Sequence, residues 1–510
     1  MNELHTSHNH RWIILMIMSL SLMIVMINNV TLNVALPELS TDLGADNTQL
    51  QWIIDAYALA FGGSLLLMGA LGDRFGRKGA LQVGLVIVAI SAWWTSQFAT
   101  TAEHVIAARA FMGFGAALVM PATLSIIIVV FPKNERGKAI GIWAAMAGVG
   151  APLGLVVGGY LIENYQWQTV FLVNVPVIIM ALLMGIKFVP KSRELEKKPL
   201  DWMGAFLSII SLSTLLFAII EGPELGWTNV KVLGIASLSL VSAIAFVLWE
   251  KRVSHPILPL SFFSNKGYTV GLIAIGLSFF VMFSFMYMLM LNFQLVRGLS
   301  PLAAAIHFVP LPLGLMPAAA NSERLVTKFG SNKVVGTGLL IVAIALLTFT
   351  QITVSTSFLN IGLMLWLLGT GMGLTMAPST TVVMDSIPED KSGVGSATND
   401  ASREIGGALG VAIGGSVLNE IYRSTINIPL ELESKSTLIE QSFPGAIRLG
   451  NQLIQQGNPI GQTLIENAQI AFVEGMAASS LVAACIAFIA SFIAFAKMPK
   501  KTNQLNEGEE

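Results

Sequence analysis

The 510-residue sequence has little charge and almost no cysteine. Asp, Glu, Lys and Arg make up 12% of the residues, about half of the roughly 25% found in soluble domains. The net charge of −1 provides no electrostatic attraction for nucleic acid. The single cysteine, Cys485, excludes an internal disulfide and a cysteine-based zinc site. A disulfide-rich domain and a DNA-binding protein are therefore both excluded.

Motifs of enzymes and cofactor proteins are also missing. The sequence contains no metal-ligand spacing, no nucleophile elbow and no phosphate-binding glycine loop. We therefore expect no enzyme activity, no cofactor and no bound metal. The first apolar stretch, from about Trp12 to Val34, is too long for the core of a signal peptide and is followed by no cleavage pattern. We expect it to be a retained membrane span.

Long apolar runs are abundant, since 54% of the residues are hydrophobic and the mean hydropathy is +0.71. A helix needs about 20 apolar residues to cross a bilayer, and the sequence predicts an all-α integral membrane protein with 14 spans. They are expected at about 12–34, 51–71, 79–98, 105–130, 139–162, 169–189, 203–221, 232–250, 268–292, 302–322, 334–351, 357–381, 393–421 and 470–496. With the N-terminus inside, the inner segments hold 22 Lys and Arg and the outer segments five. This imbalance predicts that both termini are cytoplasmic.

A duplicated pattern runs through the chain. The stretch "GAPLGLVVGG" from residue 150 reappears as "GGALGVAIGG" from residue 406, with five identical residues 256 positions apart. The stretch "DRFGRK" at 73–78 has a weaker copy, "TKFGSN", at 327–332. Spans 2, 4 and 5 therefore correspond to spans 10, 12 and 13. Two six-helix halves alone would need an offset of roughly 200, so spans 7 and 8 are predicted to be inserted. Such repeats around a midplane site are typical of transporters.

These motifs resemble the major facilitator superfamily. The stretch "GALGDRFGRK" is similar to its cytoplasmic loop motif at Gly69, Asp73, Arg74, Gly76, Arg77 and Lys78, with Gly72 where the family often has alanine. Arg109 in "ARAFMGFGAALVMPA" resembles the arginine of the family's span 4, and "GVGAPLGLVVGG" resembles the span-5 motif of drug exporters. Fourteen spans, "LNVALPEL" and "WIIDAYAL" narrow the resemblance to drug:proton antiporters of the QacA/EmrB type, from about residue 12 to 497.

The resemblance implies a major facilitator fold with two six-helix halves and two inserted helices. The expected division is 1–11 cytoplasmic N-terminus, 12–189 first half, 190–267 linker with the inserted helices, 268–497 second half with an extracellular loop at 423–469, and 498–510 cytoplasmic tail. We expect a monomer in a bacterial plasma membrane that binds small-molecule drugs and protons. The outer loop is expected to form a hairpin or amphipathic helices.

Two motifs have expected mechanical roles. By the resemblance, Asp73 with Arg74, Arg77 and Lys78 is expected to form a gating latch; a basic loop that only fixes topology is the alternative. In span 5, small residues allow close helix contact and Pro152 supplies a bend. We expect this motif to lie where the two halves meet, with contacts made by Gly150, Gly154, Gly158 and Gly159.

Charged residues inside spans are costly and mark functional sites. Asp55 in span 2 and Arg109 in span 4 both fall about 6 to 8 Å below the outer end of their spans. We expect them to form an ion pair, which is either static or broken by a proton or a cationic substrate. Asn28 falls at a similar depth, where many members of the resembled family have an aspartate. It could hydrogen-bond to either partner, but it cannot titrate.

Span 13 contains "SATNDASREIGG", which places Asn399, Asp400, Arg403 and Glu404 on one face of a helix. Because lipid does not tolerate such a face, we expect it to line a cavity. Two carboxylates and one arginine leave a charge near −1, which suits a proton carrier and a competing lipophilic cation. A structural network in which Arg403 neutralises Asp400 is the alternative.

The expected function is proton-driven multidrug efflux of hydrophobic cations such as quaternary ammonium compounds, dyes, antiseptics and antibiotics. One alternative is an exporter of a single antibiotic, such as a tetracycline, or of a metabolite. Another is a membrane receptor or scaffold that does not transport. In span 10, His307 could relay protons or merely pack, and prolines at 310, 312 and 317 predict a kink.

Overall fold

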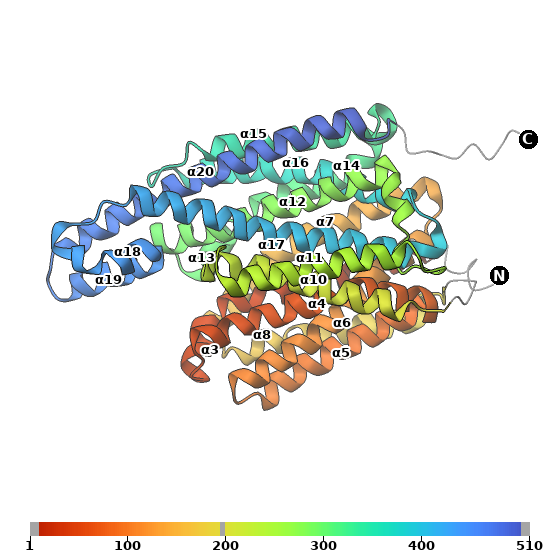
Figure 1. Cartoon of the computed structure of the whole chain (residues 1–510), viewed down its shortest axis with the longest axis horizontal. Coiled ribbons are helices and arrows are strands. Elements are labelled where there is room, and N and C mark those ends of the chain that lie inside the picture. The colour runs from red at the N-terminus through yellow and green to blue at the C-terminus, as the bar shows by residue number, and fades with distance from the viewer. Residues whose placement is uncertain (1–9, 194–198, 501–510) are drawn as a thin grey trace, which may run out of the picture.

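The computed structural model describes residues 10–193 and 199–500, and this part of the chain contains helices and no strands. Fourteen segments are long and apolar enough to cross a membrane, which confirms the predicted number of spans. The first span begins and the last span ends at the same end of the molecule, which we call the terminal end (Figure 1). Most of the two predicted tails and residues 194–198 of the predicted linker lie outside the described residues.

The first half consists of six spans, shown from red to yellow in Figure 1. Asp46 fixes the start of its second span, since its carboxylate accepts a hydrogen bond from the N–H of Gln49 at 2.8 Å. Within this half, α4 and α5 pack on α6, and α2 packs on α7. Its elements are α2 (Arg11–Val30), η1 (Thr31–Val34), α3 (Leu36–Asp42), α4 (Asn47–Phe75), α5 (Arg77–Phe98), α6 (Ala102–Val130), α7 (Lys133–Asn164), α8 (Gln168–Leu172) and α9 (Asn174–Phe188).

The two inserted spans, α10 (Trp202–Leu225) and α11 (Val230–Glu250), form an antiparallel hairpin. Helix α10 packs on α4 of the first half and on α17 of the second, so the hairpin covers the seam between them (Figure 1). Asp201 joins the two helices of the hairpin at the end away from their connection. One of its carboxylate oxygens accepts hydrogen bonds from the N–H of Gly204 in α10 and from the indole N–H of Trp249 in α11, both at 2.8 Å.

The second half repeats the packing of the first. Helices α14 and α15 pack on α16, and α12 packs on α17, as the duplicated motifs predict. Its elements are η2 (Leu260–Ser264), α12 (Lys266–Leu291), the π-helical η3 (Asn292–Val296), α13 (Pro301–Ile306), α14 (Pro310–Phe329), α15 (Ser331–Phe349), α16 (Phe358–Asp385), η4 (Glu389–Lys391), α17 (Ser392–Thr425), η5 (Leu430–Lys435), α18 (Ser436–Gln441), α19 (Phe443–Gln455) and α20 (Ile460–Lys497).

Span 10 is interrupted between α13 and α14, where the prolines predict a kink, because Pro310 lacks the N–H that a continuous helix would use. Helix α17 continues to Thr425 and α20 begins at Ile460, so both helices extend into the predicted outer loop at 423–469. Its amphipathic helix α19 buries one side, including Phe443 and Ile447, and packs on α20.

Candidate functional site

Asp73, near the end of α4, ties the two halves together at the terminal end. Its carboxylate is 2% exposed and accepts hydrogen bonds from the N–H of Gly393 at 2.8 and 3.0 Å and of Val394 at 3.1 Å. These two residues belong to the first turn of α17, where N–H groups lack helical partners and the helix dipole favours an anion. An acid of the first half thus caps a helix of the second.

Arg77 and Arg136 reinforce this contact. The Nε of Arg77 donates to Asp73 at 2.8 Å, and its Nη2 donates to the carbonyl oxygens of Glu389 and Asp390 at 3.0 and 3.2 Å. Arg136 of α7 forms an ion pair with the carboxylate of Glu389 at 2.6 Å. We call the contact of Asp73 and Arg77 with residues 389–394 the latch.

The other members of the loop motif have different surroundings. A side chain on Gly69 would collide with Gly393 and Ala397, each 2.7 Å from the Cβ position, so glycine permits the close approach of α4 and α17. Gly76, with φ at +121°, makes the turn between α4 and α5. The guanidinium of Arg74 lies over the ring of Phe75, and Lys78 donates to the carbonyl of Ile186 at 2.8 Å.

The export-motif glycines do not all lie where the sequence predicts. Gly150, Gly154 and Gly158 pack on α2 and η1 of their own half, against Met26, Val30 and Thr31 respectively. Gly159 alone of the four packs on the second half, at Leu302 of α13. The prediction of a contact between halves was therefore wrong for three of them. Residues four apart form one stripe on α7, which faces α2, whereas Gly159 lies to one side of it. Pro152 lies inside α7, as predicted.

Arg109 is held by carbonyl oxygens of two other helices. It donates from Nε to the carbonyl of Ile53 at 3.1 Å and from Nη1 to the carbonyl of Asn28 at 2.9 Å. Its guanidinium lies 4.2 Å from the ring centre of Tyr57. Asp55 and Arg109 are both buried, and the ion pair expected between them stays a prediction.

Asn28 contacts this cluster through both its main chain and its side chain. Its main-chain carbonyl accepts from Arg109, and its side-chain Oδ1 accepts from Nδ2 of Asn174 in α9 at 3.0 Å. The hydroxyl of Tyr57 donates to the carbonyl of Val25 in α2 at 3.1 Å. Arg109 and Tyr57 together therefore hold α2, α4 and α6 in register.

The charged face of α17 is buried in the middle of the protein. Asp400 and Arg403 are 0% and 1% exposed, and their closest Oδ1 and Nη1 atoms are 3.9 Å apart. The amide of Asn399 donates to the same Oδ1 at 3.3 Å. The guanidinium of Arg403 lies 4.6 Å from the ring of Trp143 in α7 and 5.2 Å from that of Phe279 in α12. One arginine is thus held between aromatic rings from both halves.

These buried charges have few hydrogen bonds. Among the described residues, no side-chain nitrogen of Arg403 has a hydrogen-bond partner, and neither does Oδ2 of Asp400. Burial of ionised groups without such bonds is costly, and it is tolerated where the groups serve a function. Glu404 follows on the same face and is partly exposed. It lies close enough to Tyr57 to interact with it electrostatically, so the two predicted charged sites adjoin each other.

Sequence reasoning missed Tyr57, Trp143 and Phe279, because a ring that receives a guanidinium has no signature of its own along the chain. His307 has the packing role named as its alternative. Its Nδ1 lies 2.7 Å from the carbonyl oxygen of Ala303, and its ring stacks at a tilt on Phe358. The described residues contain no group of three or more His, Cys, Asp or Glu placed to hold a metal ion.

Known proteins with similar sequences include a drug efflux pump and antibiotic resistance proteins. The sequence model of the Major Facilitator Superfamily matches residues 18–411 of this chain. The Multidrug efflux pump LfrA of Mycolicibacterium smegmatis is 30% identical over 94% of this chain and 95% of its own. The Methylenomycin A resistance protein of Streptomyces coelicolor is 32% identical over 76% of this chain and 81% of its own. The chain belongs to the Major Facilitator Superfamily.

A solved structure agrees on the fold. The proton:xylose symporter XylE, in complex with 6-bromo-6-deoxy-D-glucose, matches 97% of both chains with a TM-score of 0.61 at 14% identity. At that identity the likeness concerns the fold alone. The family, the efflux and resistance proteins among the relatives, and the 14 apolar helices together identify the chain as a multi-pass transporter of the bacterial inner membrane rather than an enzyme.

Proposed function

We propose that this protein is an antiporter that exports hydrophobic cations, among them quaternary ammonium compounds, dyes and antiseptics, in exchange for protons. The observation that carries the proposal is the face of α17, where Asp400 and Glu404 flank a buried Arg403. A carboxylate in a low-dielectric site is stabilised either by a proton or by a cationic substrate. The two ligands therefore compete, and that competition couples their movement.

The carboxylates have different tasks in this proposal. Asp400 is fully buried beside Arg403, which neutralises part of its charge. Glu404 is partly exposed and lies beside Gly62 of α4, where a side chain would come within 3.8 Å of its Cβ. We assign Glu404 the exchange of protons for cations, and Asp400 with Arg403 the control of the charge around it. The position of α4 beside this site is fixed by Arg109, Asn28 and Tyr57. We assign Asp55 a secondary part in proton exchange.

We place the terminal end in the cytoplasm, because the segments on that side hold 22 of the Lys and Arg residues. The latch then closes the cytoplasmic side while its hydrogen bonds to Gly393 and Val394 are intact. Its opening would expose α17 to the cytoplasm, and it would close on the bound substrate before that substrate is released outside. We propose that a monomer carries out this cycle.

The proposed stoichiometry is one proton for each monovalent cation, because Asn28 cannot titrate and Arg403 neutralises one carboxylate. Such an exchange moves no net charge. The membrane potential, worth about 2.3 kcal/mol per charge per 100 mV, would then contribute nothing, whereas each pH unit would contribute about 1.4 kcal/mol.

Energised cells that are loaded with a fluorescent cation test this proposal, because they maintain both a pH gradient and a membrane potential. Nigericin in potassium medium should stop export, and valinomycin should leave it nearly unchanged. Transport that is insensitive to nigericin would refute proton antiport. Strong inhibition by valinomycin would mean that at least two protons move per cation.

A second candidate is export of a single antibiotic, and it is favoured by the similarity to a Methylenomycin A resistance protein. Export that is limited to one compound in a panel of antibiotics, dyes and quaternary ammonium salts would establish this alternative. Export of several unrelated cations would exclude it.

A further inference from the structure

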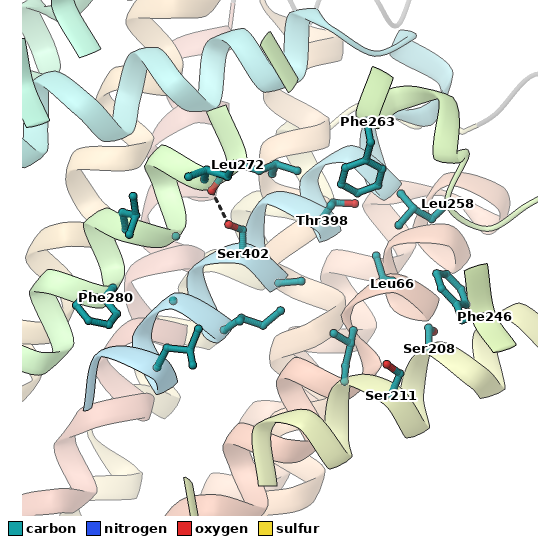
Figure 2. A pocket seen from close by; sticks show the side chains of 18 residues that line it. Leu66, Ser208, Ser211, Phe246, Leu258, Phe263, Leu272, Phe280, Thr398 and Ser402 are labelled. Carbon is teal, nitrogen blue, oxygen red and sulfur yellow. Dashed lines mark hydrogen bonds between the residues drawn. The ribbon is translucent and has the colours of Figure 1, made fainter. Parts of the chain in front are cut away.

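An apolar chamber of about 510 Å³ lies between the inserted hairpin and the second half. Figure 2 shows Ser208 and Ser211 of α10 and Phe246 of α11 on one side of it, and Leu272 and Phe280 of α12 on the other. Helix α17 and Leu66 of α4 complete the wall. Because α10 and α11 provide one side, the chamber exists only in a chain that has the inserted hairpin.

Three of the four hydroxyl groups that line the chamber donate to carbonyl oxygens of their own helix or of a neighbouring one. The hydroxyl of Ser402 donates to the carbonyl of Leu272 at 2.6 Å, a bond drawn in Figure 2. Thr398 donates to Val394 at 2.9 Å, and Ser208 donates to Ala205 at 2.8 Å. None of the described residues that line the chamber is charged. The chamber therefore suits a chemical group that neither donates nor accepts hydrogen bonds.

Glu404 does not line this chamber, but it adjoins residues that do. The residue after it, Ile405, lines the chamber. On α10, Leu212 lines the chamber, and Leu216 one turn later packs against Gly62, which also lies beside the Cβ of Glu404. An acidic residue thus stands at the corner of α4, α10 and α17, next to an uncharged apolar space.

We propose that the chamber holds the alkyl tail of an amphiphilic cation while Glu404 faces its charged head. This inference rests on the proposed function and narrows its substrates to cations with a flexible hydrocarbon chain. The volume lies within the range of about 300 to 1,000 Å³ that is typical of small-molecule sites. The inserted hairpin is then a substrate-binding element, since it builds the half of the tail site that the two six-helix halves lack.

Alkyltrimethylammonium ions with chains from hexyl to hexadecyl test this inference by binding to the purified full-length protein. Each added methylene should tighten binding three- to fourfold, equivalent to about 0.8 kcal/mol, until the chamber is full. Ser211→Phe places a ring in the chamber and should weaken binding of the dodecyl compound about tenfold, as expected if about two methylenes are displaced. Binding of the hexyl compound should stay unchanged.

Two further variants keep the test decisive. Ser237→Phe makes the same substitution on an exposed position of α11 away from the chamber, and it should leave the whole series unchanged. Phe246→Ala enlarges the chamber and should move the best chain length upward, opposite to Ser211→Phe. Opposite shifts cannot arise from a general loss of stability.

The possible failures are distinguishable. If the wild-type protein binds and exports the hexyl cation but neither variant changes the dependence on chain length, the chamber proposal is wrong and the proposed function stands. If no cation of the series is bound or exported, the proposed function itself fails. If a zwitterionic alkylphosphocholine of equal chain length, which has no net charge, competes as well as the cation in wild-type and Glu404→Gln proteins, the chamber is a lipid site and the proposal is overturned.

Discussion

Helices α7 and α17 occupy equivalent places in the two halves, but only α17 carries charge in its middle. The residues 256 positions before Asp400, Arg403 and Glu404 are Ala144, Ala147 and Gly148. The small residues have been kept at both places, since Gly393 and Gly137 both pack against the opposite half. The duplication therefore preserved the close-packed surfaces, whereas the ionisable groups in the middle of the helix are found on one copy.

The latch shows the same asymmetry. The counterpart of Asp73 in the repeated motif is Thr327, whose hydroxyl donates to the carbonyl of Arg324 in its own helix at 2.9 Å. No helix of the first half is capped by it among the described contacts. The contact between α14 and α7 places Ala319 against Gly141 and the carboxylate of Glu323 against Gly137. One interface between the halves thus holds a carboxylate that caps a helix, and the equivalent one holds a carboxylate that packs on a glycine.

The largest effect is expected from the charged copy. Glu404→Gln and Asp400→Asn should each reduce proton-coupled export to background. An amide at position 404 cannot exchange a proton, and an amide at position 400 leaves the buried charge of Arg403 without its partner. Drug-induced proton release from inverted vesicles is the measurement. Ala144→Ser at the equivalent place in α7 is the matched control and should keep wild-type export. Wild-type rates in both carboxylate variants would remove α17 from the coupling mechanism.

Asp73→Asn should lower export about tenfold and leave equilibrium binding of substrate unchanged. An amide binds the N–H groups of Gly393 and Val394 less well than a carboxylate, and a hydrogen bond to a charged group contributes about 1.5 to 3 kcal/mol. The defect therefore lies in switching between conformations. Export and binding are measured on the same preparation, with Thr327→Ala as the control in the uncharged copy. Loss of binding at normal protein level would contradict the assignment of a latch.

Trp143→Leu should slow export severalfold, since a guanidinium over an aromatic ring gains about 0.5 to 2 kcal/mol. Trp143 is the residue of α7 whose ring contacts the charged Arg403 of α17. This substitution therefore tests whether the two equivalent helices act together. Phe279→Leu removes a ring from the same half as Arg403 and serves as the comparison. An effect of Phe279→Leu without one of Trp143→Leu would confine the site to the second half.

The smallest expected effect is that of Asn28→Asp, which adds a carboxylate to the uncharged cluster around Arg109. Export should become partly dependent on the membrane potential, because a second proton can then move with each cation. Inhibition by valinomycin is the measurement, and Asn28→Ala should not acquire it. An unchanged response in Asn28→Asp would show that this position takes no part in coupling.

Several features were predictable because they depend on residues close together in the chain. Apolar runs of sufficient length define the 14 spans, and glycines at a fixed offset reveal the repeat and the inserted pair. Helical spacing alone places Asp400, Arg403 and Glu404 on one face. Asp73 stands out because a carboxylate precedes a glycine turn and basic residues, although its partners on α17 lie 320 residues away.

What the tertiary structure decided is how each helix is rotated about its axis. The rotation of α4 turns the carbonyl of Ile53 and the ring of Tyr57 toward Arg109, and nothing in the spacing along the chain predicts these two contacts. The same freedom directs three export-motif glycines to α2 and places Trp143 against Arg403. The chamber likewise arises only where α10, α12 and α17 meet. Spacing along one helix determines which residues share a face, but only packing among all helices determines what that face meets.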